Sequence, residues 1–139
     1  MTGTMELTDQ PRSEDVQFLE DQLNEHNMVR TGRRDFSPLA VYLRDEQGGI
    51  TAGLYGFTWA GWLEIKSVWV RKDLRGQGHG RQLVEVAEVE ARARGCKRVW
   101  LESYTFQAPT FYQRLGYVVF GSLHDYPAPH GRVFLTRTL

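Results

Sequence analysis

Apolar residues recur at helical spacing near the start of the chain. Val16, Leu19 and Leu23 stand at i, i+3 and i+7, which places them on one face of a helix. We expect this helix to begin at Pro11 or to use Ser13 as its cap, because proline suits the first turn and serine suits a cap. The pattern predicts a helix with one apolar side.

A second helical pattern lies in the middle of the chain. Leu83, Ala87 and Ala91 repeat every four residues and predict a helix over about 80–94. Gly95 follows directly, and glycine is favoured where a helix ends in the left-handed conformation. This segment is therefore expected to pack one side against a core.

Strands are predicted where β-branched, aromatic and alternating residues gather. They cover residues 4–8, 39–43, 50–59, 62–70, 98–104, 117–123 and 132–138, with a short helix over 108–115 and a loop or short helix over 24–37. Alternation along 62–70 predicts that Glu64 shares a face with Val68 and Val70. The order of elements indicates a mixed α/β fold.

Composition narrows the class of protein. The chain has 139 residues, which suits a single domain over 1–139, and 41% apolar with 12% aromatic residues argues against disorder. Lys+Arg and Asp+Glu both number 17, so bulk charge does not favour nucleic-acid binding. No apolar run is long enough to span a membrane and no signal peptide is evident, so we expect a cytoplasmic protein. Cys96 is the one cysteine and is expected to be a buried apolar residue rather than a nucleophile.

A glycine-rich loop joins the strand at 62–70 to the central helix. Its sequence from Arg75 to Arg81 is Arg-Gly-Gln-Gly-His-Gly-Arg. Glycine lets the backbone approach a ligand, and the free N–H groups at the start of a helix favour an anion. The loop lacks the Gly-Lys-Ser/Thr of a Walker loop, and Arg81 stands where the last glycine of a Rossmann fingerprint belongs. We therefore expect a different kind of phosphate site.

The pattern Arg-x-x-Gly-x-Gly at Arg75, Gly78 and Gly80 resembles the acetyl-CoA signature of the GCN5-related N-acetyltransferase (GNAT) superfamily. A second segment, residues 107–117, resembles the A-x-x-F-Y-x-x-x-G-[FY] motif of the same superfamily and stands in the same order along the chain. The resemblance covers residues 38–123. It implies a central mixed, mostly antiparallel sheet with splayed middle strands and helices on both faces.

The resemblance also implies an acetyl-CoA site. In the superfamily the glycine loop binds the CoA pyrophosphate with main-chain N–H groups, and the strand before it pairs with the pantetheine arm. Carried over, the binding residues are Val68, Trp69, Val70, Arg75, Gly76, Gln77, Gly78, His79, Gly80 and Arg81. A backbone N–H near Val68 is expected to stabilise the oxyanion of the thioester.

The implied reaction is the direct attack of an amine on the thioester. Tyr112 matches the position where a tyrosine hydroxyl protonates the CoA sulfur, although it could instead be a core aromatic like Phe111. A base must take the amine proton, because an amine is mostly protonated at pH 7. Glu64 matches the glutamate of histone-acetylating members, acting directly or through water. Its alternative role is a surface carboxylate paired with Lys66.

Weaker signals concern the acceptor. The last hairpin, with His124, Asp125, Tyr126 and His130, borders the acceptor site in the superfamily, or here is only a structured turn. The run of Arg30, Arg33 and Arg34 could bind an acidic substrate or simply be solvated. Trp59 and Trp62 suit the core or a dimer surface, and homodimers are frequent in the superfamily. The four histidines have no metal-binding spacing, so no metal is expected.

Three functions remain open. The first is an N-acetyltransferase that acts on a primary amine of a small molecule or a protein. The second is an acetyl-CoA-binding sensor without catalysis, which would need neither Glu64 nor Tyr112. The third is a nucleic-acid-binding domain that uses the arginine run, against which zero net charge counts.

Overall fold

The computed structural model describes residues 2–139 and divides into two compact units, one up to Arg34 and one from Asp35 to Leu139. The first unit holds a single helix, α1 (Ser13–Thr31). Its end is fixed by Gly32, which adopts φ +70° and donates its N–H to the Met28 carbonyl at 2.8 Å. No residue of α1 is buried.

The sequence misjudged two features of this unit. The predicted strand over 4–8 is wrong, because these residues form no strand, and a strand is stable only when a neighbour pairs with it. The expected loop or short helix over 24–37 is mostly a continuation of α1. A bidentate ion pair between Arg34 and Glu25, at 3.0 and 3.1 Å, follows the helix end.

The second unit contains one sheet and two α-helices. Its elements are β1 (Ser37–Arg44), β2 (Ile50–Trp59), β3 (Trp62–Val70), a short 3-10 turn at Lys72–Leu74, α2 (His79–Ala93), β4 (Arg98–Tyr104), α3 (Pro109–Arg114), β5 (Val118–His124) and β6 (Gly131–Thr138). These bounds lie within two residues of the expected ones. The mixed, mostly antiparallel α/β fold is therefore confirmed.

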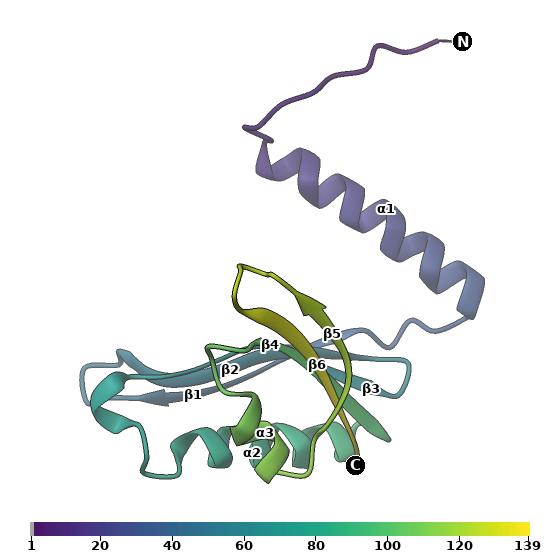
Figure 1. The fold of residues 1–139 in the computed structure, drawn as a ribbon. Coiled ribbons are helices and arrows are strands. Elements are labelled where there is room, and N and C mark those ends of the chain that lie inside the picture. Colours follow the sequence, from purple (N-terminus) through teal and green to yellow (C-terminus); the bar gives the residue numbers. More distant parts are fainter. Residues whose placement is uncertain (1) are drawn as a thin grey trace. The chain divides into compact units, whose positions relative to one another are not determined.

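The core of this unit lies between the sheet and α2. The predicted stripe of Leu83, Ala87 and Ala91 is buried, together with strand residues such as Leu63 and Leu135. Figure 1 shows α2 and α3 covering the same face of the sheet, so the expectation of helices on both faces is wrong for this unit. Burying this apolar area supplies the main favourable free energy of folding. Cys96 is also buried, as predicted, and burial raises the pKa of its thiol.

The sheet opens in its middle. The strand order is β1-β2-β3-β4-β6-β5, and every neighbouring pair is antiparallel except β3 with β4. The parallel pairing of β3 with β4 ends at Ile65 and Leu101, although the two strands continue to Val70 and Tyr104. The expected splay of the middle strands is therefore confirmed, and it leaves two unpaired strand edges facing a gap.

A bulge in β3 changes which side chains share a face. Tyr55 of β2 pairs with Ser67 and the next residue, Gly56, pairs with Ile65, so Lys66 is an extra residue in β3. Beyond this bulge the alternation is reversed. Val68 and Val70 consequently pack against the core on the α2 side, whereas Ser67 and Trp69 are exposed.

Candidate active site

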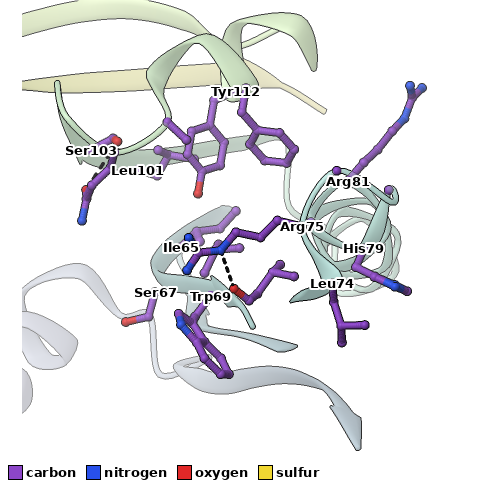
Figure 2. Close-up of a pocket in the computed structure, with 18 of the residues that line it drawn as sticks. Ile65, Ser67, Trp69, Leu74, Arg75, His79, Arg81, Leu101, Ser103 and Tyr112 are labelled. Atoms are coloured by element: carbon purple, nitrogen blue, oxygen red, sulfur yellow. Dashed lines mark hydrogen bonds between the residues drawn. The ribbon is translucent and has the colours of Figure 1, made fainter. Parts of the chain in front are cut away.

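The gap between β3 and β4 forms a cleft of about 1000 Å³. The end of β3 and the glycine loop form one side, and the end of β4 with α3 forms the other. Of the predicted site residues, those that line the cleft are Val68, Trp69, Val70, Arg75, Gly76, Gly78, His79, Gly80, Arg81 and Tyr112. Figure 2 shows this arrangement. Gln77 and Glu64 are not among the lining residues.

The β3 wall turns backbone N–H and C=O groups toward the cleft. The Arg71 N–H donates to the Thr51 carbonyl of β2 at 2.9 Å. Because bonded residues alternate in an antiparallel pair, Val68 and Val70 turn their N–H and C=O groups away from β2, toward the gap. The Arg75 Nε donates to the Val70 carbonyl at 2.8 Å, which agrees with that direction (Figure 2). An extended ligand can therefore pair with this edge.

The glycine loop needs two left-handed residues. Gly76 has φ +76° and Gly78 has φ +88°. Residues with a Cβ rarely adopt this left-handed backbone conformation. Helix α2 begins directly after Gly78, so its first N–H groups have no partner within the helix. Figure 2 shows the side chains of His79 and Arg81 pointing away from the cleft, so this end of the cleft is formed mainly by backbone.

Close packing joins the start of α2 to α3. A Cβ built on Gly80 would lie 3.2 Å from the Phe111 ring, so a larger residue would require the ring to shift. Phe111 in turn meets the Tyr112 ring edge-on, with centroids 5.0 Å apart. The two motifs that are distant in the sequence thus form adjoining parts of one site.

Tyr112 is buried except for its access to the cleft. Its side chain is 9% exposed, and Figure 2 shows its hydroxyl pointing into the cleft. Burial raises the pKa of Tyr112 to about 12, so the hydroxyl keeps its proton at neutral pH. It can donate that proton to an atom in the cleft.

Glu64 lies elsewhere than its predicted position. The prediction that it shares a face with Val68 and Val70 is wrong, because the bulge at Lys66 reverses the alternation between them. Its carboxylate is 3.1 Å from the Lys66 ammonium, and its side chain is 19% exposed. Lys66 itself lines the cleft, so the ion pair connects Glu64 to the site.

A buried ionic cluster holds the elements around the cleft. Glu88 of α2 accepts a hydrogen bond from the Tyr117 hydroxyl at 2.8 Å and two from Arg137 of β6 at 2.9 Å. Tyr117 also donates its N–H to the Tyr112 carbonyl at 3.0 Å. Burial, and then the neighbouring Glu88 carboxylate, raise the pKa of Tyr117. The cluster connects α2, the end of α3 and β6.

Sequence reasoning missed the β4 wall. Four residues at the end of β4 and just after it line the cleft, although none of them was assigned a role from the sequence: Glu102, Ser103, Phe106 and Gln107. One signal could have found them: a strand that follows the central helix and runs parallel to β3 must end at the same edge of the sheet. Its last residues therefore face the same gap.

Other chemistry is not evident in the described residues. Residues 2–139 contain no group of three or more His, Cys, Asp or Glu that could hold a metal ion. No helix among them is long and apolar enough to cross a membrane.

The splayed parallel strand pair, the glycine loop that opens a helix and the tyrosine hydroxyl in the cleft are the features that the resemblance to the GNAT superfamily implied. The family model for the acetyltransferase (GNAT) family matches residues 4–117. The chain therefore belongs to the GNAT family, and it is an acetyltransferase.

Two relatives support this assignment. An acetyltransferase of Agrobacterium fabrum is 34% identical over 117 residues, which cover 84% of this chain and 85% of the relative. The blasticidin-S acetyltransferase of Streptomyces morookaense is 40% identical over 102 residues, which cover 70% of this chain and 75% of the relative.

Solved structures show the same fold. A crystal structure from Agrobacterium tumefaciens, itself assigned as an acetyltransferase, matches 99% of this chain and 100% of its own with a TM-score of 0.92 and 30% identity. A structure from Bacillus anthracis, assigned as a streptothricin acetyltransferase, was solved in complex with acetyl coenzyme A. It is 19% identical, covers 66% of this chain and 57% of its own, and has a TM-score of 0.59.

Proposed function

We propose that residues 1–139 act as a single N-acetyltransferase domain, which moves an acetyl group from acetyl-CoA to a primary amine in a ternary complex. One observation carries the proposal: the cleft between β3 and β4 runs to the glycine loop and receives the Tyr112 hydroxyl. This arrangement offers a phosphate-binding end, a strand edge for an extended arm and a proton donor.

Acetyl-CoA fits the residues of the cleft. The pyrophosphate binds the backbone N–H groups from Arg75 to Arg81, where the positive end of α2 favours an anion. The pantetheine arm pairs with the edge of β3 at Val68 and Val70, next to the hydrogen bond that Arg75 donates to the Val70 carbonyl. The cleft volume of about 1000 Å³ suits an extended ligand of this size. The B. anthracis complex supports the same donor.

The reaction needs two proton transfers. The amine nitrogen attacks the thioester carbonyl, forms the new C–N bond and expels the CoA sulfur as the C–S bond breaks. Tyr112 gives its hydroxyl proton to that sulfur and later recovers one from solvent. Glu64 accepts the proton that the amine loses, directly or through a water, from the position beside Lys66. The N–H of Val68 stabilises the oxyanion during the attack.

We propose a small-molecule amine as the acceptor. The blasticidin-S acetyltransferase of S. morookaense is one of the relatives, which makes blasticidin S the first acceptor to test. A protein lysine or N-terminus is the alternative acceptor. We further propose that the enzyme works in the cytoplasm, as a homodimer and without a metal.

The test is CoA release with acetyl-CoA and a panel of amines that includes blasticidin S, followed with a thiol reagent. We expect turnover with at least one amine, and about 10-fold lower kcat for Glu64→Gln. Glu85→Gln, an exposed carboxylate on α2, is the matched control and should keep its kcat. Acetyl-CoA binding without turnover of any amine would contradict the enzyme hypothesis and favour the alternative of an acetyl-CoA-binding sensor. A failure to bind acetyl-CoA would contradict both.

A further inference from the structure

Four aromatic side chains gather beside the cleft, away from the glycine loop. Tyr104 and Phe106 come from the end of β4 and the segment after it, whereas Tyr126 and His130 come from the connection between β5 and β6. Tyr104 stacks on Phe106 with centroids 5.2 Å apart, and its ring is 5.7 Å from Tyr126. Phe106 meets His130 edge-on at 5.1 Å. We call these four residues the aromatic cluster.

The two segments that carry the aromatic cluster are fastened to each other. The Thr105 N–H donates to the Gly131 carbonyl at 2.9 Å, and the Gly131 N–H donates to the Thr105 hydroxyl at 3.0 Å. The Tyr104 N–H donates to Gln107 Oε1 at 2.8 Å, and the Tyr126 N–H donates to the His130 carbonyl at 2.9 Å. The rings are therefore held in place before a ligand arrives, which lowers the entropy cost of binding.

The aromatic cluster adjoins the cleft through Phe106. Phe106 lines the cleft together with Glu102 and Gln107. Phe106 is 55% exposed and Tyr126 is 44% exposed, so much of their apolar surface remains in water. Aromatic side chains fixed at a cleft but left uncovered are typical of sites that receive an apolar or flat group.

The neighbouring charges already neutralise each other. The Arg132 guanidinium forms an ion pair with Glu102, and its carbon lies 5.0 Å from the Tyr104 ring centroid and 5.3 Å from that of Tyr126. A planar conjugated group thus already lies over these rings. Because the charges of Glu102 and Arg132 neutralise each other, the surface of the aromatic cluster favours a flat group with little net charge of its own.

We propose that the aromatic cluster is an acceptor subsite, which binds a planar conjugated ring carried by the amine substrate. The proposal rests on the acetyltransferase function above and names the chemical class of its acceptor. The ring stacks on Phe106 and Tyr126, and the amine then extends from the ring toward the thioester in the cleft. A saturated ring of the same size is too thick to stack and lacks the π face.

The experiment compares 2-phenylethylamine with 2-cyclohexylethylamine, which carry the same primary amine on a planar and a saturated ring. Both are titrated calorimetrically into the protein saturated with CoA, so the comparison does not depend on turnover. We expect the planar amine to bind about 10-fold more tightly. Phe106→Leu and Tyr126→Leu should each reduce that preference by about 5-fold, because each removes one aromatic contact.

Tyr42→Leu is the matched control, because Tyr42 is 52% exposed on β1 and does not line the cleft. It should leave the preference for the planar amine unchanged. Equal affinities for the two amines, no binding of the planar amine, or an equal loss for both amines in the two cluster variants would overturn the subsite. Failure of the protein to bind CoA, measured first in the same instrument, would instead contradict the acetyltransferase function.

Discussion

The two ends of the cleft are built from different parts of the chain. At the proposed donor end, residues 68–81, the groups that face the cleft are mostly backbone N–H and C=O groups, held by Gly76 and Gly78 in left-handed conformations. At the proposed acceptor end, the aromatic cluster presents side chains from two separate segments of the chain. One end depends on conformation and the other on side-chain identity.

This difference explains why the donor is easier to infer than the acceptor. A backbone site needs glycines at fixed spacing, and that requirement is written in a short stretch of sequence. A side-chain site can change its ligand through single substitutions on loops, while the fold beneath stays the same. Substitutions at one end of the cleft should therefore change binding at that end and leave binding at the other end unchanged.

The largest effect is expected at the buried Glu88 cluster, which connects α2 with the end of α3 and with β6. Glu88→Ala removes the carboxylate from the buried cluster and leaves Arg137 and the Tyr117 hydroxyl without their partner. We expect a loss of about 3–5 kcal/mol in the free energy of unfolding, measured by urea denaturation. Glu85→Ala, which breaks only an exposed ion pair with Arg81, should cost less than about 1 kcal/mol. Equal effects would contradict the role of the cluster.

The next effect separates catalysis from donor binding. Tyr112→Phe removes the proton donor but keeps the ring, so kcat should fall about 100-fold while the KM for acetyl-CoA stays the same. Steady-state kinetics with the best acceptor of the panel measures both constants. Tyr42→Phe, which removes an exposed hydroxyl from β1, should change neither. Full turnover of Tyr112→Phe would remove Tyr112 from the mechanism.

The raised pKa of Tyr112 predicts a difference in stability at alkaline pH. The pKa is about 12 in the folded protein and about 10 in the unfolded chain. The protonated form is therefore favoured by folding, and its contribution is complete below pH 10 and is lost between pH 10 and 12. Unfolding free energies should fall by about 2 kcal/mol more in the wild type than in Tyr112→Phe over this range. Parallel pH profiles would show that burial does not hold the proton.

A smaller effect tests the backbone at the donor end. Gly78→Val places a β-branched residue at φ +88°, which should cost about 2 kcal/mol and weaken acetyl-CoA binding about 30-fold. Gly48→Val carries a similar strain at φ +84° in the turn between β1 and β2, distant in sequence from the loop. It should lose stability but bind acetyl-CoA normally, as measured by calorimetry. Unchanged binding by Gly78→Val would mean that the loop does not hold the donor.

The sequence predicted most of the fold because its strands and helices satisfy local rules. The apolar spacing of Leu83, Ala87 and Ala91 identified the buried side of α2, and the strands from β1 to β6 lie close to their expected bounds. The strand prediction for residues 4–8 was wrong, because a pattern in the sequence cannot supply the neighbouring strand that a strand needs. Local patterns therefore predicted elements but not their pairing.

Two features of the site could not be read from the sequence. The bulge at Lys66 has no local signature, yet it turns Glu64 and Val68 to opposite faces of β3. The aromatic cluster depends on the meeting of two segments that are about twenty residues apart, which only the tertiary fold determines. The glycine loop and Tyr112 could be found because each lies in a compact motif.

The central claim is that the splayed cleft binds acetyl-CoA, and thermal unfolding tests it most directly. Acetyl-CoA at about 100 times its Kd should stabilise the protein by about 2.7 kcal/mol. For a chain of this length the melting temperature Tm should rise by roughly 6–15 °C. ADP and free phosphate at the same concentration should raise it far less, because they lack the arm that pairs with β3. No shift with saturating acetyl-CoA, or an equal shift with ADP, would contradict the account.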